Sequence, residues 1–137
     1  MTLLEAAKKA KAERRSVFII GNGGSYANAM HICNDLLSVG VRAFTMDPST
    51  LTAFSNDHGY PYAFQRWLHV VANPSDILVA LSGSGKSANI LKAIDAAESM
   101  GLDVVKVFGA ANGFQMQEAE EVQIRLGHAA MKALKNG

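Results

Sequence analysis

Cysteine is nearly absent from this 137-residue chain, which contains a single one, Cys33. An intrachain disulfide framework is therefore excluded, and one isolated thiol is typical of a reducing compartment. Long apolar runs are absent as well: the first, residues 17–20, is much shorter than the core of a signal peptide, and none is long enough to span a membrane. These absences predict a cytoplasmic protein that does not act in a membrane.

An excess of one charge is also absent, since 13 lysines and arginines face 12 aspartates and glutamates. This balance argues against a nucleic-acid partner, and the hydrophobic content of 49% argues against disorder. The length suits one domain over residues 1–137. We expect a short N-terminal helix over residues 2–15, a core over 16–126 and a short C-terminal segment over 127–137.

Short, β-branched apolar runs recur along the chain and alternate with stretches of helical spacing. There are five of them, at residues 16–21, 42–46, 76–81, 103–108 and 121–126. Runs that are apolar on both faces are typical of a parallel sheet covered by helices on both sides. The sequence therefore predicts an α/β fold, a three-layer doubly wound sheet of five parallel strands in the flavodoxin-like order 2-1-3-4-5. Between the second and third runs we expect a polar loop over residues 55–59 and a helix over 60–71.

Glycine and serine gather in two loops, residues 21–25 and 82–87, which follow the first and third predicted strands. In this strand order the two strands are neighbours, and ligands bind in the crevice between the loops that leave them. Glycines let backbone N–H groups approach an anion at the start of a helix, and serine hydroxyls donate to phosphate oxygens. The pair predicts a site for a phosphorylated small molecule; the alternative is two ordinary turns with serine caps.

Two nucleotide-binding motifs fail on inspection. The run Gly85-Lys86-Ser87 ends like a triphosphate-binding loop, but the glycine required five residues earlier is Ala80. A dinucleotide fingerprint starting at Gly21 would need a third glycine where the chain has Tyr26. A phosphorylated ligand other than a nucleotide is therefore favoured.

Several motifs together resemble the SIS (sugar isomerase) domain family, in particular its phosphoheptose isomerase branch. They are Gly-Asn-Gly-Gly-Ser at 21–25, Asn-Ala-Met-His at 28–31, Asn-Asp-His-Gly at 56–59 and Leu-Ser-Gly-Ser-Gly-Lys-Ser-Ala-Asn at 81–89. The resemblance covers about residues 16–126 and implies an aldose–ketose isomerase acting on sedoheptulose 7-phosphate. It implies that the phosphate is held by the second loop and the sugar by the first loop and the Asn-Asp motif. The substrate-binding residues carried over are Ser82, Gly83, Ser84, Ser87, Asn22, Gly23, Ser25 and Asp57.

Exchange of an aldose and a ketose needs a base to remove a carbon-bound proton and an acid to return one at the neighbouring carbon. His31 and Asp35 lie four residues apart, so they share one face of the predicted helix over 25–39 and can act on one ligand or metal. The resemblance implies that both are catalytic and that both can bind zinc, with Asp35 in place of a glutamate base. The alternatives are a partly buried helix histidine and a solvated surface aspartate.

The ends of the chain depart from the family pattern, in which a C-terminal helix carries a glutamine and, eight residues later, a histidine. Only eleven residues follow Leu126, so we expect that histidine position to lie beyond Gly137 and His128 to flank a short terminal helix. Two hypotheses remain: an isomerase, or a non-catalytic SIS protein that binds a sugar phosphate or associates with a replication initiator. The resemblance also implies a homo-oligomer, dimer or tetramer, for which Leu36, Leu37 and Val39 offer apolar surface.

Overall fold

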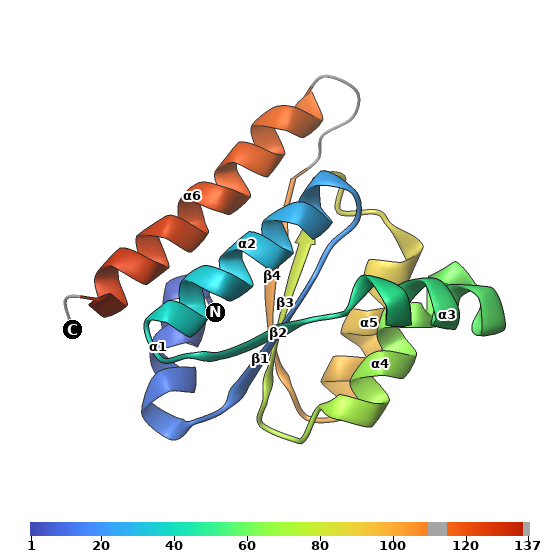
Figure 1. Cartoon of the computed structure of the whole chain (residues 1–137), viewed down its shortest axis with the longest axis horizontal. Coiled ribbons are helices and arrows are strands. Elements are labelled where there is room, and N and C mark those ends of the chain that lie inside the picture. Colours follow the sequence, from blue (N-terminus) through green and yellow to red (C-terminus); the bar gives the residue numbers. More distant parts are fainter. Residues whose placement is uncertain (110–114, 136–137) are drawn as a thin grey trace.

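The computed structural model of the chain, shown in Figure 1, describes residues 1–109 and 115–135. Across that part of the chain, four parallel strands form one sheet in the order β2-β1-β3-β4. They are β1 (Ser16–Ile20), β2 (Arg42–Thr45), β3 (Ile77–Ser82) and β4 (Asp103–Phe108). The α/β class, the parallel sheet and the order of these four strands are as predicted.

Helices cover both faces of the sheet (Figure 1). One face carries α1 (Leu3–Glu13), α2 (Gly24–Ser38) and α6 (Gln115–Lys135), and the other carries α3 (Pro48–His58), the 3₁₀ turn η1 (Tyr60–Tyr62), α4 (Ala63–Val71) and α5 (Ala88–Ser99). Each face has its own hydrophobic core, because alternate residues of β1 and β3 point to opposite sides. All six residues of β3 are buried, as expected for a central strand.

The predicted fifth strand is wrong. Residues 121–126 lie inside α6, a helix of 21 residues, and the segment predicted as short after residue 126 is the second half of that helix. Residues 121–126 alternate apolar with polar or charged side chains, so this run lacks the two apolar faces on which the prediction rested, and Val122 and Leu126 are exposed. The buried residues of α6 follow helical spacing instead and include a polar and a small side chain: Gln123, Gly127, Ala130 and Leu134.

Two smaller predictions on this chain are also corrected. The predicted polar loop over residues 55–59 is helical as far as His58, because Pro48 at the first turn and an Asp47 N-cap start a helix that continues to Gly59. Leu36, predicted as surface, is fully buried beneath α2.

Cys33 is buried too, and burial raises the pKa of its thiol, which makes it a poor nucleophile. Among the described residues, no helix is long and apolar enough to cross a membrane.

Candidate functional site

The two glycine- and serine-rich loops meet at the carboxyl ends of β1 and β3, which pair directly with Ile20 opposite Ala80. They line a common pocket of about 70 Å³. Its walls are Asn22, Ser25, Leu81, Ser82, Gly83, Ser84, Ser87 and Met116. A pocket of this size suits a small anion better than a complete sugar.

The serines of the second loop keep their hydroxyl protons available. Ser82 Oγ accepts from the Gly85 N–H at 2.9 Å and Ser84 Oγ accepts from the Lys86 N–H at 3.1 Å, so both serve as acceptors within the turn. Ser87 occupies the N-cap of α5, yet its side chain makes no capping hydrogen bond. Ordinary serine capping therefore does not account for Ser87, and the three O–H groups can donate to an anion.

The first loop is tied to α6 through its serine. Gln123 Nε2 donates to Ser25 Oγ at 3.0 Å, and Asn28 Nδ2 donates to Gln123 Oε1 at 2.9 Å. Gln123 is buried, with 1% of its surface exposed, so this polar chain is shielded from water. Because the Ser25 oxygen accepts from Gln123, its proton is left to donate into the pocket. Gly23, at φ +54°, sits where only glycine is unstrained, and no side chain makes a capping hydrogen bond at the start of α2.

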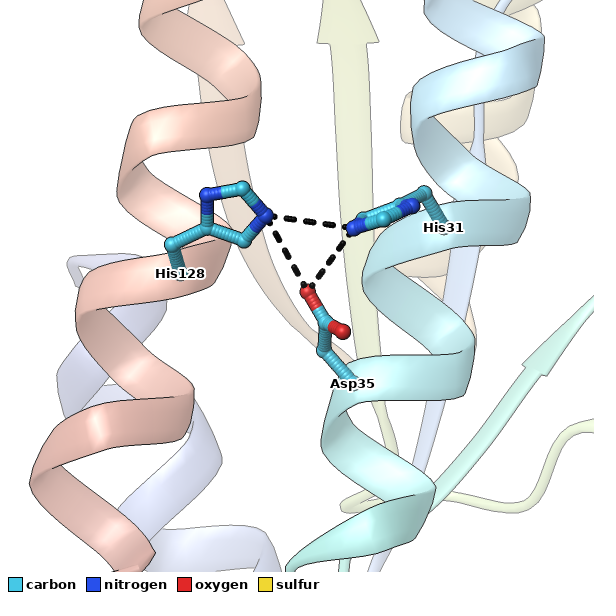
Figure 2. Close-up of side chains that lie close together, drawn as sticks. All are labelled: His31, Asp35 and His128. Carbon is cyan, nitrogen blue, oxygen red and sulfur yellow. Dashed lines mark hydrogen bonds and ion pairs between the residues drawn. The ribbon is translucent and has the colours of Figure 1, made fainter.

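A second cluster lies further along the same two helices. Figure 2 shows His31 and Asp35 of α2 and His128 of α6 pointing toward one another. The Nε2 atoms of the two histidines are 3.1 Å apart, and Asp35 Oδ2 lies 3.3 Å from His31 Nε2 and 3.7 Å from His128 Nε2. Asp35 is buried, with 8% exposed, and Oδ2 makes no hydrogen bond of acceptable geometry among the described residues. Asp35 is therefore not a solvated surface charge.

The sequence prediction for His128 is thus wrong: it does not flank a terminal helix but projects from the middle of α6 into this cluster. Eight residues before His128, at the spacing where the family pattern has a glutamine, the chain has Glu120. Its carboxylate packs against the backbone of Gly24, where a Cβ atom would come within 2.4 Å of it. The long helix that carries His128 was missed because residues 121–126 were assigned to a strand, although helix-favouring residues on both sides of Gly127 were its available signal.

A close contact between the two helices brings the cluster together. A Cβ atom added to Gly127 would lie 2.6 Å from Ile32 Cγ1, and Ile32 is fully buried. Ile32 follows His31 and Gly127 precedes His128, so the cluster sits beside the point of closest approach. Glycine at 127 is therefore needed for the distance between the helices rather than for its backbone angles.

We expect Gly127→Ala to lower the free energy of unfolding by about 1–2 kcal/mol, because overpacking costs more than the roughly 1 kcal/mol that alanine gains over glycine in a helix. Denaturant unfolding would measure this change. Lys132→Ala, at an exposed position of the same helix, is the control and should leave stability within about 0.5 kcal/mol of the parent. A Gly127→Ala protein as stable as the parent would contradict the contact.

Two predicted substrate-binding residues, Gly23 and Asp57, lie outside the pocket lining. Asp57 is exposed on α3, and its carboxylate accepts from the Asn56 side chain at 3.3 Å. Lys86 is exposed at the edge of the serine loop, as expected for a solvated charge. The structure therefore brings together His31 with Asp35, and the serines with Asn22, while Asp57 is not joined to either group.

Comparison with known proteins gives a consistent relationship. The family model described as the SIS domain matches residues 2–109. A phosphoheptose isomerase from Sodalis glossinidius is 41% identical over 119 residues, which are 82% of this chain and 61% of that protein. One from Rhodospirillum rubrum is 40% identical over 135 residues, 90% of this chain and 71% of that protein. The chain thus spans about three fifths to seven tenths of the length of these relatives.

Solved structures agree with the sequence relatives. Phosphoheptose isomerase GmhA from Neisseria gonorrhoeae has a TM-score of 0.86 and 25% identity, covering 98% of this chain and 83% of that one. A phosphoheptose isomerase from Francisella tularensis shares the fold, with a TM-score of 0.84 at 24% identity, covering 98% of this chain and 85% of that one. The chain therefore belongs to the SIS domain family, in the group of proteins named phosphoheptose isomerase.

Proposed function

We propose that this chain is an aldose–ketose isomerase that acts on sedoheptulose 7-phosphate, with the serine pocket as the phosphate site and the cluster of His31, Asp35 and His128 as the reacting centre. The observation that carries the proposal is that α2 and α6 contribute to both sites: Ser25 and Met116 line the serine pocket, and the same two helices carry the cluster. Six residues separate Ser25 from His31, which is about 9 Å along a helix. When the serine pocket holds the phosphate at one end of an extended sugar chain, the carbonyl end of the sugar can therefore reach the cluster and react there.

In this proposal each site does one task. The Ser82, Ser84 and Ser87 hydroxyls and the start of α5 bind the phosphate dianion, and the first loop orients the sugar. Holding the sugar in one pose makes the subsequent proton transfer effectively unimolecular. The remaining substrate residues from the sequence prediction, Gly23, Gly83 and Asp57, are proposed contacts of the same ligand.

The reaction itself requires proton transfer between neighbouring carbons. Asp35 is proposed as the base that takes the carbon-bound proton next to the carbonyl, giving an enediol. His31 and His128, each within hydrogen-bonding reach of the other, are placed to return a proton to the neighbouring carbon and to the oxygen. An imidazole is suited to both directions because its ordinary pKa lies near neutrality.

The same cluster fits a zinc ion. Two ligand atoms of a tetrahedral zinc site, each at about 2.0–2.1 Å from the metal, stand about 3.3 Å apart. The three contacts here are 3.1, 3.3 and 3.7 Å, and the buried Asp35 Oδ2 lacks a hydrogen bond within the described part of the chain. Two imidazoles and a carboxylate are a common catalytic zinc set that leaves a fourth position open. Zinc would take up the same nitrogen and carboxylate atoms, so with zinc bound the three side chains would act as ligands instead of as free acids and base, and the ion would supply a Lewis acid for the substrate oxygens.

A turnover assay with sedoheptulose 7-phosphate tests the proposal directly. We expect conversion by the parent chain and loss of that conversion in His31→Ala. The second candidate is a sugar-phosphate-binding protein without catalysis, cytoplasmic like the first. It is favoured by Asp35 and Glu120, which stand where the family pattern has glutamate and glutamine. Saturable binding of the sugar phosphate with no conversion would support that candidate.

We also propose that the chain forms a homo-oligomer, dimer or tetramer, through the outer face of α2. Met30 and Leu37 lie seven residues apart on that face and are 42% and 51% exposed, whereas the buried Leu36 does not contribute. We expect Leu37→Glu to shift the protein to a smaller species in sedimentation velocity at micromolar concentration. The exposed Leu91→Glu on α5 is the control. A parent chain that sediments as a monomer would contradict the proposal.

A further inference from the structure

We infer that Tyr60 is a positioning residue for the first loop, because its hydroxyl completes the set of contacts that fixes the side-chain amide of Asn22. The inference builds on the proposed function, in which Asn22 faces the sugar. It adds a residue from the opposite face of the sheet, at the start of η1, to the ligand site.

Asn22 is held by two side chains that are distant in sequence. Its Nδ2 donates to Asn89 Oδ1 at 2.9 Å, and its Oδ1 accepts from Asn89 Nδ2 at 2.8 Å. The Tyr60 hydroxyl lies 2.5 Å from the same Oδ1. Asn89 is buried, with 3% exposed, while 48% of Tyr60 is exposed. Asn22 also lines the pocket, so this network connects the pocket wall to the outside of the molecule.

The polarity of the network is determined by a backbone group. A reciprocal amide pair is unchanged if both amides turn over, so the pair alone does not decide which atom of Asn22 is oxygen. The Ile90 N–H donates to Asn89 Oδ1 at 3.0 Å, and this donor requires an acceptor there. Asn89 is thereby fixed, the pair fixes Asn22, and Tyr60 must donate its proton to Asn22 Oδ1.

This polarity specifies what a ligand can find at the first loop. The Asn22 oxygen already accepts two hydrogen bonds, so the amide offers a ligand only its second N–H. The Tyr60 hydroxyl donates its proton to Asn22, so toward a ligand its oxygen can only accept a hydrogen bond. The pair therefore matches a ligand that presents an acceptor beside a hydroxyl, as in a polyhydroxylated carbonyl compound. Sulfate, which has acceptor oxygens but no hydroxyl, offers the Tyr60 oxygen no donor.

Tyr60→Phe in the full chain tests the inference with two measurements. The first is the side-chain amide signals of Asn22 in ¹⁵N-labelled protein without ligand, which we expect to shift and broaden once the hydroxyl is removed. The second is calorimetry, in which we expect the affinity for sedoheptulose 7-phosphate to fall about tenfold while that for sulfate changes less than about twofold.

Tyr62→Phe is the matched control, because Tyr62 lies in the same turn and its ring, which stays, packs under Lys92 Nζ at 5.0 Å. It should leave both measurements unchanged. Asn22 amide signals that are identical in Tyr60→Phe and the parent would overturn the inference, as would an equal loss of affinity for both ligands. If the parent fails to bind the sugar phosphate at all, the proposed function fails, while the amide signals still decide the role of Tyr60.

Discussion

His128→Ala is expected to lower the isomerisation of sedoheptulose 7-phosphate by about 10² to 10⁴-fold, the range that a positioned acid or base contributes. Its Nε2 atom lies 3.1 Å from His31 Nε2 and 3.7 Å from Asp35 Oδ2, so its removal takes away one of three groups that converge on one point. Steady-state kinetics would measure the change. Because the pocket for phosphate lies about two turns away along the helices, KM should change much less than kcat.

The control for this variant is His69→Ala, since His69 is exposed on α4, on the other side of the sheet. It should retain the parent's kcat. A metal readout provides a second measurement: the parent should bind one zinc ion per chain, and His128→Ala should bind it 10- to 100-fold more weakly or worse. Full turnover in His128→Ala would place the reacting centre elsewhere, with Asp57 and His58 as the next residues to substitute.

The pocket was predictable because its signals are local. Glycines and serines that directly follow a buried strand must lie at the carboxyl end of that strand. The parallel order then places the carboxyl ends of β1 and β3 side by side. His31 and Asp35 were predictable for the same reason, since four residues along one helix determine a shared face. Asn22 and Ser82 therefore meet in the structure as the sequence predicts.

The third member of the cluster was not predictable from a local pattern. The position of His128 depends on how α6 packs, and the buried face of α6 is too mixed to be recognised by hydrophobicity: Gln123 is buried only because Ser25 and Asn28 satisfy its amide. Gly127 looks like a helix breaker in sequence but serves as the contact point with Ile32. Long-range polar partners and close backbone approach are tertiary properties, so a short run such as residues 121–126 does not reveal them.

Combining Ser84→Ala with Ser87→Ala is expected to weaken the binding of sedoheptulose 7-phosphate by about 100-fold or more, because in the proposed site each hydroxyl would donate a hydrogen bond to the charged phosphate worth about 1.5–3 kcal/mol. Stability should change little, since Ser87 does not cap α5 and Ser84 accepts only the exposed Lys86 N–H. Calorimetry and thermal unfolding would measure the two effects.

The control is Lys86→Ala, which should cost less than about threefold in affinity because its charge is solvated. Ser82 is left unchanged because its Oγ holds the turn through the Gly85 N–H. Unchanged affinity in the double variant would mean that the phosphate binds somewhere other than the serine pocket.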